Sequence, residues 1–424
     1  MLKFIGTHYF FQLPSVHSFF DKIVADLAIR KNVLVLLPEG IDLEVIREQF
    51  RFHLYNQNLS IEDVYLDGNE GKLSPIITLN EQLDFEWKTP NSPRTVSNIK
   101  HLKTMADVIH IEGLENKSKE VSLEWIKFYD SWSVFCQQYS YTEPFPGALC
   151  IIIHASKLIP LIPSSSVNIS VHWWWGFPSS LEIKLLCRMQ FGNDAFSCYN
   201  RWHEFIISSI SGGDIFLADY LWENIHNNSD IIMKSLCAFT DEKKMWKSGI
   251  FDTIVKDIVN NSIKQECKNQ SIAPPQKFYN LWVYGALYWT PEYGIETSTA
   301  LIVSLGYLEE FKHRLWRGQA ELIIPIIDSA RLMICKQFTI TYGYDWPTRW
   351  ECSLLQDKLD SVQKNPMSCQ LGHIKYILKK YMQSDWNYLR LVSLLHSIRN
   401  RLAHYCPITY QDFDELCSEI ELNL

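Results

Sequence analysis

Three residues near the end of the chain have types and a spacing suited to cutting a phosphodiester bond. Arg399 and Asn400 are adjacent, and His404 follows four positions after the amide. A permanently charged guanidinium beside an imidazole that titrates near neutrality can cleave such a bond without a metal. A plainer interpretation stays open. A cation in the last turn of a helix stabilises the helix dipole by about 0.3–1 kcal/mol, and Asn400 or His404 can cap carbonyls.

The motif falls at the end of an expected amphipathic helix, residues 385–403. Its apolar stripe recurs every three or four residues, and Pro407 prevents the helix from continuing. Further helices are expected over 315–338, 350–362, 373–381 and 410–422, with a kink at Pro325. Short connections favour antiparallel neighbours, so the last ~115 residues are predicted to form a helical bundle. The stripe of the motif helix consists of Leu389, Val392, Leu395, Ile398 and Leu402.

The stretch from Arg399 to Pro407 resembles the R-N-x-x-x-H signature of the HEPN family, whose members are often ribonucleases. The resemblance covers about the last quarter of the chain and implies a homodimer with a composite cleft. It implies that Arg399 stabilises the charged transition state and that His404 acts as general base or acid. Asn400 would orient the histidine or hold a phosphate oxygen. The implied products are a 2′,3′-cyclic phosphate and a 5′-hydroxyl, with no metal and no cofactor.

Family members often carry an acid in the first bundle helix that positions the arginine. Glu321 and Asp328 are the candidates in this chain, and they lie seven residues apart, on one face of the helix. Asp328 is included in the predicted catalytic set, whereas Glu321 is interpreted as a solvated surface charge. Arg314, Trp316, Arg317 and Arg331 on the same helix could guide a phosphate backbone, or simply pair with nearby acids.

The first ~190 residues alternate helix and strand patterns, which is typical of a layered α/β domain. Helices are expected over 16–29 and 43–55, the second capped by Asp42. Strands are expected over 32–37, 63–66, 107–111, 149–154 and 167–172. Because the runs are apolar throughout rather than alternating, they favour parallel strands buried on both faces.

The order of these elements resembles a P-loop ATPase. A strand, the loop Pro38–Asp42 and a helix occupy the place of the phosphate cradle, and a later strand ends in Glu112 as a Walker B strand does. However, the cradle needs a glycine-rich loop and a Lys-Ser/Thr pair, and this loop has one glycine and no lysine. ATP hydrolysis is therefore not expected. The region is interpreted as a P-loop-like fold that has lost nucleotide chemistry, or as an unrelated α/β layer.

Three regions follow from these patterns: an α/β domain over 1–190, a helical connector over 191–308 and the HEPN-like bundle over 309–424. In the connector, Asp214 is the expected cap of a helix. Upstream, Trp173, Trp174 and Trp175 could stack a nucleic-acid base or form an aromatic core cluster at a strand end.

Composition limits the possible partners. The net charge of −8 argues against broad attraction to nucleic acid, so any RNA contact has to be local or built by an assembly. Eleven cysteines are scattered without metal-ligand spacing, which is typical of reduced thiols in a cytoplasmic protein. The longest apolar run, 148–163, is too short and too polar to cross a bilayer.

Two functions from different classes remain. The first is a HEPN-type RNA endonuclease, an effector or subunit of a bacterial anti-phage or toxin system, with an N-terminal domain that regulates it. The second is a non-catalytic subunit of a multi-protein defence complex that uses the bundle only to dimerise. A nucleotide- or nucleic-acid-sensing module is a third alternative.

Overall fold

The computed structural model describes most of the chain. It covers residues 4–66, 74–91, 93–102, 106–137, 146–159, 162–224, 229–243, 246, 255, 256, 258, 272–349, 362–382 and 386–424. These residues form two compact units. The first contains residues 1–182, 213–216 and 243–298, and the second contains 183–212, 217–242 and 299–424. The predicted boundaries at residues 190 and 308 remain predictions.

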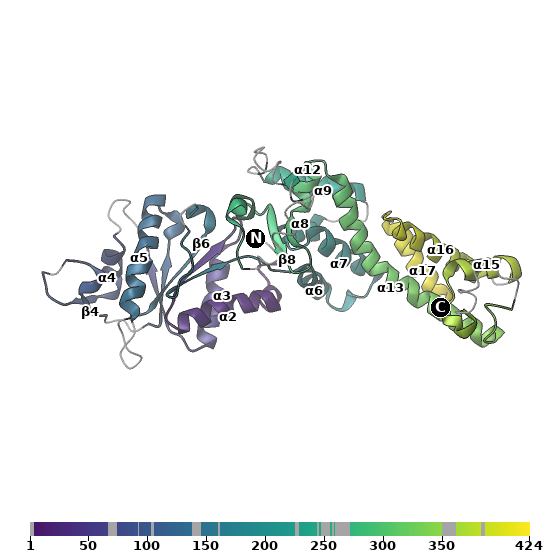
Figure 1. Cartoon of the computed structure of the whole chain (residues 1–424), viewed down its shortest axis with the longest axis horizontal. Coiled ribbons are helices and arrows are strands. Elements are labelled where there is room, and N and C mark those ends of the chain that lie inside the picture. The colour runs from purple at the N-terminus through teal and green to yellow at the C-terminus, as the bar shows by residue number, and fades with distance from the viewer. Residues whose placement is uncertain are drawn as a thin grey trace. The chain divides into compact units, whose positions relative to one another are not determined.

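The first unit is built on a parallel sheet of five strands in the order β2-β5-β6-β1-β7. All the pairs within it are parallel. Figure 1 shows α2 and α3 on one side of the sheet and α5 on the other. The strands are β1 (Asn32–Leu37), β2 (Ile61–Tyr65), β5 (Val108–Glu112), β6 (Ala148–His154) and β7 (Ile169–Trp173), and the main helices are α2 (Pro14–Ala28), α3 (Leu43–Asn56) and α5 (Lys119–Gln137).

The apolar runs of the sequence account for this sheet. Every residue of β1 and β5 is buried, as expected for strands covered on both faces. A buried amide then fixes the layers: the Asn32 side chain donates to the Tyr129 carbonyl at 3.0 Å and accepts from the Leu149 N–H at 2.9 Å. The predicted parallel α/β layer is confirmed, and Asp42 caps α3 by accepting from the Glu44 N–H.

Smaller elements complete the first unit. Two of them are antiparallel hairpins, β3–β4 and β8–β9, which the apolar patterns did not predict. The elements are α1 (His8–Phe11), α4 (Pro75–Leu83), β3 (Phe85–Trp87), β4 (Ile99–Leu102), α11 (Tyr279–Val283), β8 (Leu287–Thr290) and β9 (Gly294–Thr297), with 3-10 turns over Val96–Asn98, Leu114–Asn116, Ala155–Lys157 and Gln276–Phe278.

The second unit is helical in its described part. Its helices are α6 (Ser180–Phe191), α7 (Cys198–Ser211), α8 (Ile215–Asn224), α9 (Ser229–Glu242), α12 (Thr299–Ser304), α13 (Leu308–Tyr342), α15 (Leu371–Tyr381), α16 (Trp386–Ala403) and α17 (Tyr410–Asn423), with 3-10 turns over Gly192–Asp194 and Pro366–Ser368. The first residues of α6 and α8 belong to the first unit.

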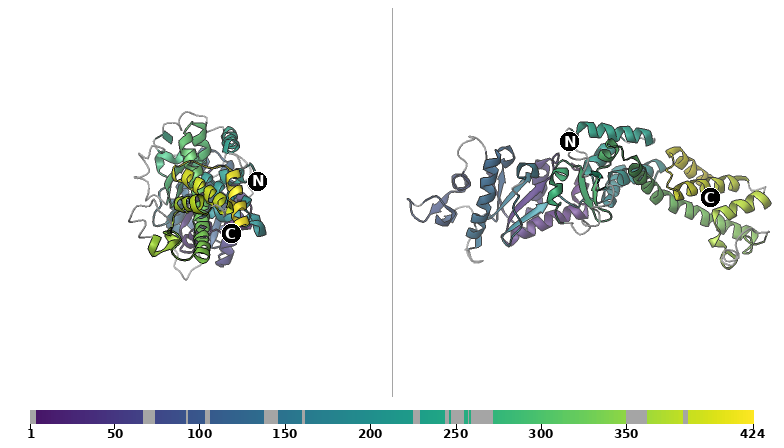
Figure 2. Two further views of the ribbon diagram at one scale, coloured as in Figure 1. Left: turned by 90° about the vertical axis from the view of Figure 1, so that its right-hand side faces the viewer. Right: turned by 45° about the horizontal axis from the view of Figure 1, so that its top comes forward.

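The 35-residue helix α13 is the central element of the second unit. Its first half packs on α7, where Gly318 brings the backbones close: a Cβ at this position would lie 2.7 Å from the Phe205 carbonyl oxygen. Helix α16 also packs on α13, and Figure 2 shows the C-terminal helices beside it. Helix α13 continues through Pro325, and the kink expected there remains a prediction. The helix expected over 350–362 lies outside the described residues except for Val362.

Candidate functional site

The predicted motif lies on the polar face of α16 and in the turn that follows it. The opposite face is the expected stripe, in which Val392, Leu395, Ile398 and Leu402 are at most 2% exposed. The helix ends at Ala403 because the backbone at Tyr405 turns into the left-handed region, with φ of +57°. The amide of His404 still donates to the Asn400 carbonyl at 3.1 Å, so the histidine extends the helical face by one position.

Three side chains of α16 form a chain of polar contacts. The Arg399 guanidinium donates through Nη1 to Asn400 Oδ1 at 3.3 Å. The amide nitrogen of Asn400 lies 3.3 Å from His396 Nε2. Asn400 was expected to orient His404 or hold a phosphate oxygen. Its side chain instead contacts Arg399 and His396, the latter four residues earlier on the same face. Arg399 and His404 are both exposed.

A hollow of about 800 Å³ opens beside this face of α16. Helices α13, α15 and α16 surround it, together with Val362, Ser368 and Gln370 from the segment before α15. Its polar and charged lining residues are Asp328, Arg331, Ser368, Gln370, His373, His396 and Arg399. His396 and Gly372 meet at its wall, where a Cβ on the glycine would lie 3.3 Å from His396 Nε2. The hollow thus brings together Arg399 and Asp328, two of the four predicted residues; Asn400 and His404 are not among its lining residues.

Asp328 positions an arginine, but its partner is Arg331. The carboxylate Oδ1 accepts from Arg331 Nη2 at 2.8 Å and from Nε at 2.9 Å. Arg331 also donates through Nη1 to the carbonyls of Met367 and Cys369, which anchors the segment before α15. This arginine is therefore committed to structure, and Arg399 is the exposed cation at the hollow. Glu321 forms a surface ion pair with Lys184.

His396 is tuned toward its neutral form. Partial burial lowers the pKa of its imidazole, and the positive charges of Lys375 and Arg399 lower it further. The lowered pKa favours the neutral imidazole, which can accept as well as donate a hydrogen bond. The sequence signal for His396 was its position at i−4 from Asn400 on one helical face.

Buried side chains of α13 hold the turn after the motif. Gln319 is 1% exposed, and its amide donates to the Ile408 carbonyl at 2.9 Å while accepting from the Ile408 N–H at 2.8 Å. Trp316 donates through Nε1 to the Leu402 carbonyl at 2.6 Å. From α16 itself, Arg401 donates to the Pro407 carbonyl and pairs with Asp412. These contacts fix the end of α16 without using Arg399 or His404.

The loop after β1 does not have the chemistry of a phosphate cradle. The Glu39 amide donates to the Val283 carbonyl at 2.7 Å, and its carboxylate accepts from the Ser156 hydroxyl. At the end of β5, Glu112 forms an ion pair with Arg51 and contacts His110. The hydrogen bond from His110, together with nearby positive charge, lowers the pKa of Glu112. Glu112 is therefore an ionised partner in a network, as expected for a structural acid.

Two groups of side chains in the described part of the chain have metal-ligating potential. Asp63, His110 and Glu112 form one group, but the Arg51 guanidinium bonds to both of its carboxylates and competes with a cation. In the other group His17 and Asp21 are exposed and His53 is buried, and Asp21 bridges His17 at 2.8 Å and His53 at 3.2 Å. Two imidazoles and a carboxylate are donors suited to zinc, nickel or copper.

Comparisons with known proteins leave the family open. No protein-family profile and no curated protein matches this chain. Among solved structures, the RuvB Holliday junction branch migration motor of Thermotoga maritima is similar over 72% of this chain and 98% of its own, with 14% identity and a TM-score of 0.33. A likeness at this level does not indicate a function. In the described part of the chain, no helix combines the length and apolar character needed to cross a membrane.

Proposed function

We propose that the helical C-terminal part of this chain is a metal-independent RNA endonuclease of the HEPN type, acting as a homodimer in a bacterial anti-phage or toxin system. The observation that carries the proposal is the hollow with Arg399 on its wall, next to His396, whose pKa is lowered by partial burial and nearby positive charge. An exposed guanidinium beside a cavity of this size suits a phosphate and its attached nucleotide.

Each residue has a separate task in this proposal. Arg399 binds the scissile phosphate and stabilises the charge that builds up on its oxygens. His404 exchanges the proton with the ribose 2′-hydroxyl or the leaving 5′-oxygen, and Asn400 holds Arg399 through its amide oxygen. His396 lies eight residues before His404, a rise of about 12 Å along a helix. The two imidazoles of one subunit are therefore too far apart to act on one phosphate.

This distance favours a composite site. An exposed His404 at a helix end is free to meet a motif from a second copy, whereas His396 stays at the wall of its own hollow. His396 then contacts the RNA beside the scissile bond and contributes mainly to binding. The N-terminal unit, which lacks a phosphate cradle, serves regulation through a trigger or another protein of the system.

A specific observation favours the second candidate, a non-catalytic dimerisation subunit. Helix α13 exposes the apolar side chains of Met333 and Ile340, which are 42% and 79% exposed and, seven residues apart, lie on one face of the helix. Surface of this kind fits a subunit interface. Both candidates predict a dimer, so the catalytic test has to separate them.

The test is RNA cleavage by the purified full-length protein in EDTA, with single-stranded RNA as substrate. Arg399→Ala and His404→Ala are each expected to lower the rate at least about 100-fold. Arg390→Ala is the matched control, because Arg390 is an exposed arginine on the same helix that pairs with Glu419. His396→Gln is expected to raise KM more than it lowers kcat.

The outcomes separate the two candidates. If wild type and His404→Ala leave RNA equally intact in vitro, and in cells with and without the native trigger, the nuclease proposal fails. A dimer in sedimentation that is lost on Ile340→Asp then supports the dimerisation subunit.

A further inference from the structure

An aromatic pocket lies at the carboxyl end of β1, where the strand order of the sheet reverses. After β1 the chain passes to β2 at the far edge of the sheet and returns through β5 to β6, which lies beside β1. From β6 it then crosses β1 to form β7 on the opposite side of β1. In open parallel sheets, ligands bind at the strand ends around such a reversal. The pocket begins at Pro38, directly after β1, and continues to Trp174 and Trp175, directly after β7.

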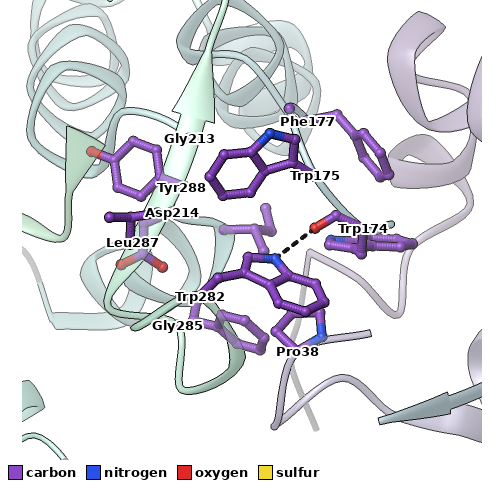
Figure 3. A pocket seen from close by; sticks show the side chains of 13 residues that line it. Pro38, Trp174, Trp175, Phe177, Gly213, Asp214, Trp282, Gly285, Leu287 and Tyr288 are labelled. Carbon is purple, nitrogen blue, oxygen red and sulfur yellow. Dashed lines mark hydrogen bonds between the residues drawn. The ribbon is translucent and has the colours of Figure 1, made fainter. Parts of the chain in front are cut away.

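The walls of the pocket are mainly aromatic. Figure 3 shows the indoles of Trp175 and Trp282 on two sides, with Tyr288 and Asp214 at one end and Trp174 at the other. Trp174, Trp175 and Trp282 are at most 4% exposed, and Tyr288 is half-buried at the rim. The lining consists of Pro38, Trp174, Trp175, Gly176, Phe177, Gly213, Asp214, Ile215, Phe216, Trp282, Gly285, Leu287 and Tyr288.

The surrounding backbone is built to hold this shape. Trp282 donates through Nε1 to the Trp174 backbone carbonyl at 3.0 Å, which fixes the Trp282 indole against the segment after β7. Gly213 lets the segment before α8 approach the β8–β9 hairpin, since a Cβ there would lie 2.9 Å from the Tyr288 ring. Gly40 adopts φ of +91°, and a Cβ on it would lie 3.2 Å from the Phe216 ring. The pocket is therefore a feature of several fixed elements.

The charge of the pocket is opposite to that of a phosphate site. Asp214 brings a carboxylate that is 4% exposed, and none of the lining residues is basic. Aromatic faces attract cations through the negative potential above their rings, and a carboxylate at the same site adds to this attraction. A phosphate would meet a buried acid in place of a lysine. Lys243 is not a lining residue, but its Nζ lies 5.1 Å from the centre of the Phe216 ring, so one aromatic side chain of the pocket wall is within reach of a cation.

We propose that this pocket binds a compact organic cation, an alkylated ammonium head group of a small molecule, at the position where a P-loop protein binds phosphate. Its cavity volume of about 40 Å³ has room for a few water molecules and excludes a nucleotide. The methyl groups contact the indoles of Trp175 and Trp282, and Asp214 balances the charge. The ligand acts on the N-terminal unit, so this site is independent of the proposed nuclease chemistry.

The test uses choline and tetramethylammonium as probes and follows tryptophan fluorescence and heat of binding on the full-length protein. Saturable binding of both probes is expected. The neutral analogue 3,3-dimethylbutan-1-ol, which has the same shape as choline without its charge, should bind at least about tenfold more weakly. A short peptide that contains trimethyllysine is a third probe. Tighter binding of this peptide than of choline would indicate that the cation comes from a peptide, and weaker binding would indicate a free metabolite.

Variants locate the binding to the pocket. Asp214→Asn and Tyr288→Leu are each expected to weaken choline binding by about tenfold or more. Asp130→Asn changes the net charge equally at an exposed position on α5, and Tyr293→Leu alters an exposed tyrosine in the turn of the same hairpin; both should bind like wild type. Thermal melting identifies a variant that has failed to fold, in which case the other pocket variant decides.

Several results would overturn the proposal. These are equal binding of choline and its neutral analogue, an unchanged affinity in folded Asp214→Asn and Tyr288→Leu, or absence of saturable binding by any of the cations. Saturable binding of Mg-ATP that displaces choline would instead mark a retained nucleotide site.

Discussion

One buried amide, that of Gln319, helps to hold the turn that follows the Arg399–His404 motif, and its contribution can be measured. Gln319 makes two hydrogen bonds to Ile408, one to its N–H and one to its carbonyl. Gln319→Leu keeps a similar volume but leaves both backbone groups buried without a partner. Each such group costs about 1–3 kcal/mol, so after some relaxation the turn loses about 2–4 kcal/mol. A loss of this size makes opening of the turn about 30 to 700 times more frequent.

Hydrogen exchange at the Ile408 amide reports this opening directly. In Gln319→Leu the amide is expected to exchange about 30 to 700 times faster than in wild type. Glu321→Gln is the control on the same helix, because its carboxylate is 58% exposed and forms only a surface pair with Lys184. The control should alter the exchange rate by less than about threefold. If exchange in Gln319→Leu matches the control, Gln319 does not hold the turn.

Other contacts give further predictions. Arg51→Met removes the cation between Glu112 and Asp63 and should destabilise the first unit by about 1–3 kcal/mol in urea unfolding; an unchanged midpoint would refute this. His110 and nearby arginines lower the pKa values of Asp63 and Glu112, against the effect of burial. The two ionised carboxylates therefore stabilise the folded state above their ordinary pKa values of 3.8 and 4.5. This stabilisation is lost as the pH falls through their lower pKa values in the folded protein. Stability between pH 5 and pH 3 should therefore fall less in Glu112→Gln than in wild type. Gly213→Ala places a Cβ 2.9 Å from the Tyr288 ring and should cost about 1–3 kcal/mol in the same unfolding assay. Mg-ATP should release no phosphate, and turnover abolished by Glu112→Gln would contradict this expectation.

The sequence predicted the elements whose burial is uniform or strongly periodic. The predicted strand Asn32–Leu37 has the same bounds as β1. A continuous apolar run of this length is too short for a typical helix and suits a strand that is buried on both faces. Helices α2, α3, α15, α16 and α17 lie where expected, each within a few residues at its ends. Cys150, Cys187 and Cys335, which lie inside apolar runs of the sequence, are buried free thiols.

The two antiparallel hairpins and the ion-pair partners of individual side chains could not be predicted from the sequence pattern. Strands Phe85–Trp87 and Leu287–Thr290 are short and partly exposed, so neither shows a clear pattern. Arg331 was as compatible with a phosphate as with a carboxylate until the fold placed Asp328 and two carbonyls around it. Such choices depend on contacts distant in sequence.

His396 illustrates the same limit at the candidate site. Its spacing to Asn400 was visible in the sequence, but its importance follows from the hollow, which forms only when α13, α15 and α16 pack together. Arg399 and Asn400 were identified by motif and do contact each other. The role of His404 depends on a second copy of the chain and remains a prediction.

The proposal that Arg399 and His404 cut RNA is tested most directly by the chemistry of the cut ends. An RNA oligonucleotide is digested in EDTA by the wild-type protein, beside a matched oligonucleotide with 2′-deoxyribose at the cleaved position. The account predicts a 2′,3′-cyclic phosphate and a 5′-hydroxyl from the first substrate, no cut at the modified position in the second, and no products from His404→Ala. Cleavage of the deoxy-substituted position, or products of the same kind and amount from His404→Ala, would contradict it.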